Sequence, residues 1–238
     1  FYKEYLNSIY VDVFSHGIEK PDKIIKFAKD VREILGQTNQ FDQWRLVDDF
    51  KVMPGTGKIK KISTPKNGVG IVDIYIYPKK SLEVEAQFAM INKLYSPSFF
   101  NELRTNQQLG YAVFSLDYDI HDYPAIGMTI VSDNSKLQDL KEKMMDFQYG
   151  FAAALEKIDN KTIKNVKTAL LEDLTQKPEN IFVEVSPLIA DWEEGNYDFD
   201  TQEKVANYIS NTSRDDLIKL NNSFVVDGEF MNLTVQIR

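Results

Sequence analysis

The stretch FFNELRTNQQLGYAVFS, residues 99–115, joins the end of an apolar helical pattern to the start of an alternating strand pattern. Gly110 can supply the left-handed residue that ends a helix, and the helix dipole favours Arg104 in a last helical turn. In the strand that begins at Tyr111, residues 112, 114, 116 and 118 share one face and residues 111, 113, 115 and 117 the other. These patterns predict an ordinary helix-to-strand turn. A phenol and a guanidinium on one rim would also form a donor pair able to hydrogen-bond a peptide carbonyl or its oxyanion.

Composition narrows the class of protein. The chain has 238 residues, 43% hydrophobic and 27% charged, which is enough for one large or two small domains with a proper core. A net charge of -8 opposes binding to the phosphates of nucleic acid. The absence of cysteine excludes disulfides, a thiolate nucleophile and cysteine-based metal sites. No apolar run reaches 18 residues and no signal peptide is expected; a start at Phe1 suggests a processed chain or a fragment.

The hydrophobic periodicity outlines an α+β fold. Strands are expected at residues 9–16, 68–78 and 231–238 and from Tyr111, with 68–78 as a central strand and Met231, Leu233, Val235 and Ile237 on the buried face of the last. Helices are expected at 21–36, 82–104 with a kink or a restart at Ser96–Pro97, 137–158 behind a Ser135/Gln138 capping box, 161–175, 180–194, from Asp200 and from Ser213. The polar, Gly- and Pro-containing segment 36–68 is expected to be a linker with one or two short strands.

Metal-ligating and acid–base motifs are weak in this chain. His16 and Glu19 start like an H-x-x-E-H zinc motif, but Lys20 stands where the second histidine belongs. The other histidine, His121, is 105 positions away, so no metal site is predicted. Neighbouring carboxylates, such as Asp215 and Asp216, diverge on a helix surface and are interpreted as solvated side chains.

The opening stretch carries a resemblance to a known family. Its pattern F-x-x-L-R-T-x-x-Q-L-G-Y-x-V-F-S, from Phe100 to Ser115, resembles the signature of the C-terminal half of the pitrilysin and insulin-degrading enzyme family of zinc peptidases. The resemblance extends to the I-Y-I-Y-P strand, the KPEN segment and the W-x-x-x-x-x-Y-x-F-D stretch from Trp192. It implies an α+β domain with a mixed or antiparallel sheet covered by several helices. It also implies that residues 1–45 end the preceding domain and that residues 46–238 form the C-terminal domain.

The resemblance also implies roles for two residues. In the family, residues like Arg104 bind the substrate backbone, and residues like Tyr111 reach the scissile carbonyl, where water polarised by zinc attacks. The zinc and its H-x-x-E-H helix belong to the N-terminal half, which this sequence does not include. The implied partners are therefore that N-terminal half and peptide substrates, with zinc as a cofactor of the other half only. Neither nucleic acid nor a membrane is expected, and the isolated chain is expected to be inactive.

Two alternatives stay open at this stage. A non-catalytic member of the same superfamily would keep the fold as an interaction or assembly subunit, although the presence of both Arg104 and Tyr111 argues against it. An H-x-x-E-H motif several hundred residues upstream of Phe1 would decide between the two. A bacterial pitrilysin-like enzyme would imply the periplasm, with the cytoplasm as the alternative.

Overall fold

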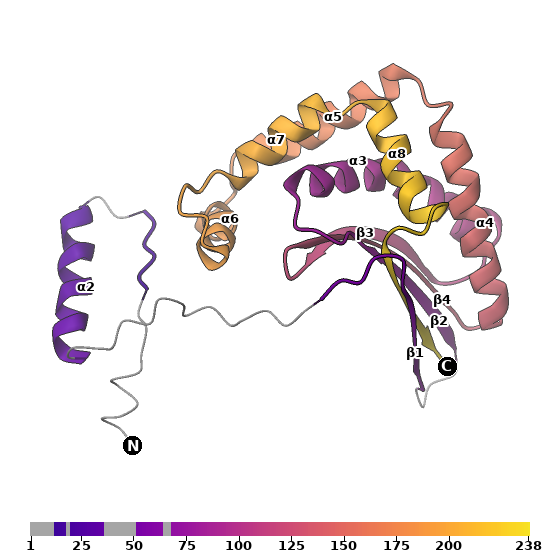
Figure 1. The fold of residues 1–238 in the computed structure, drawn as a ribbon, viewed down its shortest axis with the longest axis horizontal. Helices are drawn as coiled ribbons and strands as arrows, with labels where there is room; N and C mark the ends of the chain where they lie inside the picture. Colours follow the sequence, from indigo (N-terminus) through magenta and orange to yellow (C-terminus); the bar gives the residue numbers. More distant parts are fainter. Residues whose placement is uncertain (1–11, 18–19, 36–50, 64–67) are drawn as a thin grey trace. The chain divides into compact units, whose positions relative to one another are not determined.

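The computed structural model describes residues 12–17, 20–35, 51–63 and 68–238, which fall into two compact units (Figure 1). The described part of residues 1–49 groups with residues 178–199, and residues 50–177 group with 200–238. The domain boundary near residue 45 stays a prediction.

The larger unit is built on one mixed five-stranded sheet. Its strands are β1 (Gly57–Ile62), β2 (Val69–Ile76), β3 (Ala112–Ile120), β4 (Tyr123–Ser132) and β5 (Met231–Ile237). The order is β1-β5-β2-β4-β3; β1 pairs with β5 in parallel, and the other pairs are antiparallel. The predicted central strand at 68–78 is confirmed, because β2 has neighbours on both sides. The α+β class with a mixed sheet is likewise confirmed.

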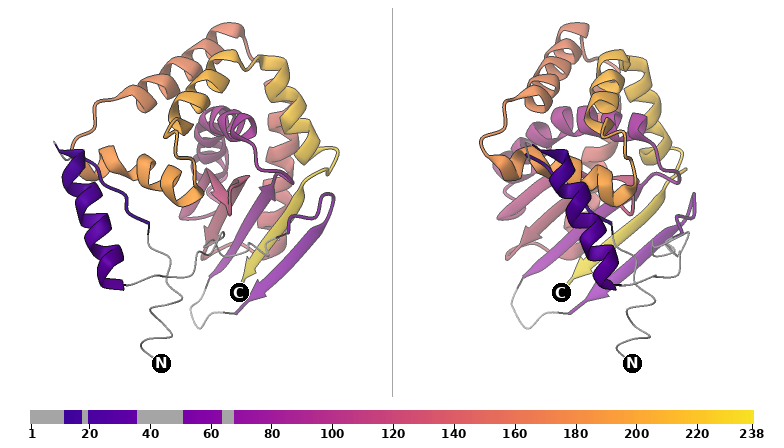
Figure 2. Two further views of the ribbon diagram at one scale, coloured as in Figure 1. Left: turned by 60° about the vertical axis from the view of Figure 1, so that its left-hand side comes forward. Right: turned by 90° about the vertical axis from the view of Figure 1, so that its left-hand side faces the viewer.

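Helices cover one face of this sheet (Figure 2). They are α3 (Leu82–Phe99), α4 (Leu137–Leu155), α5 (Asn160–Thr175), α7 (Thr201–Asn211) and α8 (Arg214–Val225). Helix α3 crosses β3 and β4, α4 lies on β2, and α8 contacts both helices; α5 and α7 pack against α3. We call the sheet face under α3 and α4 the helix-covered face and the opposite one the open face.

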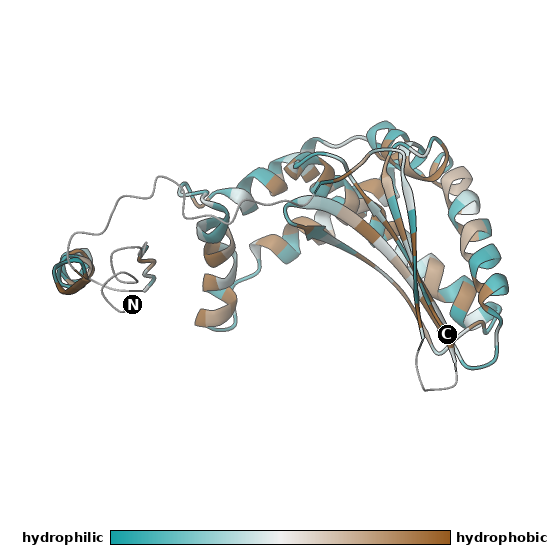
Figure 3. Cartoon of the chain, turned by 60° about the horizontal axis from the view of Figure 1, so that its bottom comes forward, coloured by the Kyte–Doolittle hydropathy of each residue, from teal (hydrophilic) through white to brown (hydrophobic). Residues whose placement is uncertain are grey.

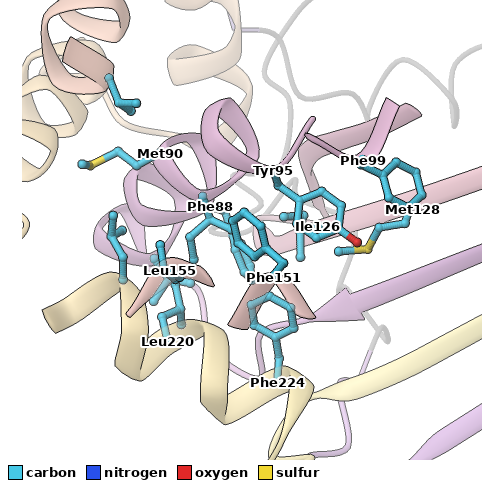
Figure 4. Close-up of a cluster of buried hydrophobic side chains, with 14 of the residues drawn as sticks. Phe88, Met90, Tyr95, Phe99, Ile126, Met128, Phe151, Leu155, Leu220 and Phe224 are labelled. Carbon is cyan, nitrogen blue, oxygen red and sulfur yellow. The ribbon is translucent and has the colours of Figure 1, made fainter. Parts of the chain in front are cut away.

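The main core lies between α3, α4, α8 and the helix-covered face (Figure 4). Aromatic rings dominate it: Tyr95 packs edge-on against Phe151 with ring centroids 4.8 Å apart, and against Phe147 at 5.0 Å. Edge-to-face contacts of this kind add to the free energy gained from burying the rings. Ile126, Met128 and Ile130 of β4 are fully buried beneath them. The core therefore fixes α3 and β4, the two elements that flank the opening sequence stretch.

Several predicted details of this unit are wrong. Of the kink or restart expected at Ser96–Pro97, the restart does not occur; α3 includes Pro97 and continues as a π-helix, η1 (Phe100–Asn106). Ser135 and Gln138 form no capping box, because the N-cap of α4 is Lys136 and has no side-chain cap bond. By contrast, Ser213 and Asp216 form a full capping box at the start of α8.

The burial of β5 differs from the prediction beyond Met231, which is buried as predicted. Thr234 and Gln236 are buried, each 7% exposed, whereas Leu233, Val235 and Ile237 are only partly buried. The register explains this, because Thr234 lies opposite Asp73 of β2 and shares with it the helix-covered face. Its hydroxyl donates to the Asp73 carboxylate at 2.8 Å, so a polar contact replaced the expected apolar one.

The smaller unit contains α2 (Pro21–Leu35) and α6 (Ile181–Glu194). Residues 12–16, the described part of the strand expected at 9–16, form no strand, because none of the described strands pairs with them. They are held by aromatic and polar contacts instead. The Asp12 carboxylate accepts from the Trp192 indole at 2.9 Å, and Phe14 stacks on the Trp192 ring with centroids 5.7 Å apart. The predicted helix at 180–194 is confirmed, and the one at 21–36 is confirmed over its described residues, 21–35.

Candidate functional site

The candidate site is the turn between η1 and β3, which carries Arg104 and Tyr111. Arg104 lies in the last turn of η1, and its Nη1 donates a hydrogen bond to the Gly110 carbonyl at 2.5 Å. Tyr111 directly precedes β3, and its backbone N–H donates to the Val131 carbonyl of β4 at 2.9 Å. The structure thus brings the Arg104 guanidinium onto the peptide group that links Gly110 to Tyr111.

The Tyr111 side chain projects from a fixed backbone into solvent. It is 56% exposed, and the described residues supply no hydrogen-bond partner for its hydroxyl. A tyrosine that only filled the turn would bury its ring, because an aromatic side chain contributes most to stability when removed from water. The hydroxyl is therefore available as a donor to a bound molecule.

Local hydrogen bonds close the C-terminal end of η1, just before this turn. The Glu102 carboxylate accepts from the side-chain amides of Asn106 at 2.9 Å and Gln107 at 2.8 Å. These bonds, that from Gln107 first, lower the pKa of Glu102 below its ordinary value. The Leu109 N–H then reaches back to the Leu103 carbonyl at 3.0 Å. The helix end is closed by local bonds, so it needs no capping residue from elsewhere.

Position 110 has no room for a side chain, so glycine is required there. A Cβ at this position would lie 2.2 Å from the Val131 carbonyl oxygen, a distance at which backbone must shift. The sequence suggested a left-handed glycine, but the left-handed residue in the turn is Gln108, with φ of 53°. Gly110 instead permits close approach of the turn to β4, which sets where Tyr111 begins.

Neither histidine belongs to a metal-ligand cluster in the part of the chain that the structure describes. No group of three or more His, Cys, Asp or Glu side chains is close enough there to hold a metal ion. His16, in the smaller unit, contacts the Glu184 carboxylate at 3.1 Å. His121 lies in the β3–β4 turn of the larger unit with φ of 53°. The residues present therefore do not fit the zinc that the family resemblance implies for the whole enzyme.

A polar cluster on the helix-covered face was missed by the sequence reasoning. The Asp73 carboxylate, 8% exposed, accepts from Thr234 and Asn232 at 2.8 Å and from Gln148 at 3.3 Å. A cavity of about 330 Å³ lies beside it. Burial and the Asp73 charge strongly raise the pKa of Tyr75, whose hydroxyl donates to Gln148. The available signal was one carboxylate within an otherwise apolar strand, GIVDIYIY.

Comparisons with known proteins show what the chain is similar to. Residues 90–188 match the family model described as PQQ synthase PqqF-like, C-terminal lobe domain 4. "Protease 3" of Salmonella typhi is 27% identical over 152 residues, which cover 64% of this chain and 16% of that protein. The chain therefore spans only about a sixth of the length of this relative.

Solved structures share the fold. The crystal structure of pitrilysin superposes with a TM-score of 0.82 over 91% of this chain and 23% of that one, at 22% identity. The first half of the periplasmic protease PqqL from Escherichia coli gives a TM-score of 0.67 over 92% of this chain and 49% of that one, at 13% identity. No described helix is long and apolar enough to cross a membrane. The family model, the similar sequence and the shared fold converge: the chain is similar to the C-terminal region of peptidases of the insulinase (pitrilysin) family.

Proposed function

We propose that this chain is the non-zinc-binding C-terminal domain of a zinc-dependent endopeptidase and that it helps to enclose peptide substrates. The observation that carries the proposal is the exposed Tyr111 hydroxyl on a turn fixed at its backbone. A preorganised donor of this kind stabilises the charge that develops on a carbonyl oxygen during peptide cleavage. In this role Tyr111 donates to the oxyanion of the scissile bond.

Arg104 binds the substrate backbone in this proposal. A guanidinium has five N–H donors, and only the bond from Nη1 to Gly110 is found among the described residues. The remaining donors can reach peptide carbonyls while Nη1 keeps its contact with the turn. Because such contacts exist before the transition state, Arg104 contributes to substrate binding as well as to rate.

The catalytic machinery comes from a partner, the N-terminal half of the same enzyme. This sequence contains no H-x-x-E-H motif, so zinc and its ligands are assigned to that half. The proposed compartment is the periplasm, in line with the similar protease PqqL, which is described as periplasmic. Arg104 and Tyr111 support a catalytic assembly over a non-catalytic interaction subunit.

The test is Tyr111→Phe in the full-length protein that contains this chain. Deleting one oxyanion donor typically lowers kcat by about 100- to 1,000-fold. Arg104→Ala should raise KM along with any loss of kcat. Tyr208→Phe removes the hydroxyl of another exposed tyrosine, 40% exposed on α7, and serves as the matched control. A Tyr111→Phe enzyme that cleaves peptides within about threefold of wild type would refute the catalytic role.

A further inference from the structure

The segment after β4 holds the backbone of the Tyr111 turn from a second side. The Ser135 hydroxyl donates to the Leu109 carbonyl at 2.9 Å, two residues before Tyr111. Together with the bonds from Arg104 to Gly110 and from Tyr111 to Val131, this fixes three successive residues of the turn. Of the three contacts, only that of Ser135 comes from a side chain outside the signature stretch.

Ser135 is itself held in a defined place. Ser132, at the end of β4 and 1% exposed, accepts through its hydroxyl oxygen from the backbone N–H groups of Asn134 at 3.2 Å and Ser135 at 3.0 Å. The Ser135 hydroxyl does not cap helix α4, whose N-cap is Lys136. It is directed instead at a carbonyl 26 positions earlier in the chain.

We propose that Ser135 is a positioning residue for Tyr111. It does not touch substrate; it acts by holding the Leu109 carbonyl and, through it, the peptide groups that aim the Tyr111 ring. Misplacing a catalytic group by about 1 Å can cost up to about 100-fold in rate. The loss of one weak hydrogen bond can therefore lower the rate more than it lowers the stability of the fold. The catalytic part of this inference rests on the proposed function of Tyr111, whereas the structural part does not.

The experiment compares Ser135→Ala, Ser135→Thr and Ser223→Ala in the full-length protein. Ser223 is the matched control, because its part-buried hydroxyl donates to a backbone carbonyl, that of Leu220, at 2.7 Å. Ser135→Ala should lower kcat about tenfold with little change in KM. Ser135→Thr keeps the hydroxyl and should restore most of that rate, and Ser223→Ala should leave kcat unchanged.

A second measurement, amide hydrogen exchange, does not depend on activity. Loss of one neutral hydrogen bond should raise exchange at the Tyr111 amide by about 2- to 10-fold in Ser135→Ala. Amides in the middle of β2 should be unaffected, and Ser223→Ala should leave the Tyr111 amide at the wild-type rate. Unchanged exchange at Tyr111 in Ser135→Ala would overturn the proposal.

The double variant Ser135→Ala/Tyr111→Phe separates this inference from the proposed function. If Ser135 acts through the Tyr111 hydroxyl, its effect on kcat should largely disappear in the Tyr111→Phe background. A Ser135→Ala effect that persists there in full would overturn the positioning role. If Tyr111→Phe alone leaves kcat unchanged, the proposed function fails, and the exchange rate at Tyr111 then decides whether Ser135 positions the turn.

Discussion

The two faces of the five-stranded sheet differ in a way that hydropathy alone does not foresee. The helix-covered face contains fully buried side chains such as Ile130, yet it also contains the Asp73 cluster. The open face contains Phe114, Leu116 and Tyr118 of β3, which are 42%, 53% and 37% exposed and line a shallow groove. Brown segments along the strands in Figure 3 mark apolar residues of the sheet. An apolar strand face therefore indicates burial only where another element covers it.

The largest expected effect tests the covered face. Ile130→Ala removes methyl groups from a side chain that is 0% exposed and should lower the free energy of unfolding by about 2 to 5 kcal/mol. Leu116→Ala on the open face should change it by less than about 0.5 kcal/mol. Urea unfolding of both variants measures the difference. Equal losses would mean that the open face is as well packed as the covered one.

A pair of glycines next compares the Tyr111 turn with the open face. Gly110→Ala places a Cβ 2.2 Å from the Val131 carbonyl, and the backbone shift should cost about 1 to 3 kcal/mol. Gly127→Ala meets only the Tyr118 side chain, at 3.1 Å, which is partly exposed and can move. Its cost should be clearly smaller, because the tip of a side chain can move where a backbone carbonyl cannot. Thermal unfolding of the two variants measures the difference. Similar shifts in Tm would contradict the conclusion that the close approach of Gly110 to the Val131 carbonyl requires a glycine.

The polar cluster allows a sharper test, because it predicts that a more apolar residue destabilises the covered face. Thr234→Val keeps the shape but removes the donor to Asp73, and hydrogen bonds to charged groups contribute about 1.5 kcal/mol or more. Thr129→Val, opposite Val72 on the open face, is the matched control and should be neutral. If Thr234→Val were neutral too in urea unfolding, the cluster would not stabilise the fold.

The smallest expected effect concerns the helix layer that makes one face covered. The hydroxyl and backbone of Ser213 bond to Asp216 and lower the pKa of that carboxyl below 3.8. A lowered pKa stabilises the fold above about pH 3.8, and this stabilisation is lost as pH falls through the folded-state value. Because Asp216 is largely exposed, the effect should be a few tenths of a kcal/mol.

Asp216→Asn measures that contribution. Its unfolding free energy should fall less than that of wild type between about pH 5 and pH 3. Asp215→Asn, one residue earlier on α8, is the control because Asp215 is not part of the capping box. An Asp216→Asn protein with the acid sensitivity of wild type would show that the cap is not the titrating contact.

The helices and strands of this fold could be predicted from the sequence, but the contacts that each of them makes with other elements could not. The helix at 137–158 and the central strand at 68–78 follow from periodicity, which is a local property. Whether Thr234 or Leu233 faces the helices depends on the register of β5 beside β2, which no local pattern contains. Ser135 was assigned to a helix cap for the same reason, because its carbonyl partner is 26 residues away in sequence.

The candidate site was predicted from one stretch of sequence, and the roles of Arg104 and Tyr111 stay predictions. Arg104 and Tyr111 followed from eleven ordered positions in one stretch, and the site consists largely of that stretch. What the sequence could not give is the contact from Arg104 to the Gly110 carbonyl and the close approach of Gly110 to β4. Both depend on how the turn meets a strand that comes later in the chain.

Because η1 is a π-helix, the number of residues between Phe100 and Arg104 decides where the guanidinium lies around the helix axis. A π-helical turn holds more residues than an α-helical one, and each residue of an α-helix turns the chain by about 100°. One residue more or fewer between Phe100 and Arg104 would therefore move the guanidinium around the helix axis without ending the helix. A sequence alignment could place a single gap at such a change and still match Arg104 to the arginine of a relative. Conservation of the spacing F-x-x-L-R would then be a better sign of a shared site than conservation of the arginine alone.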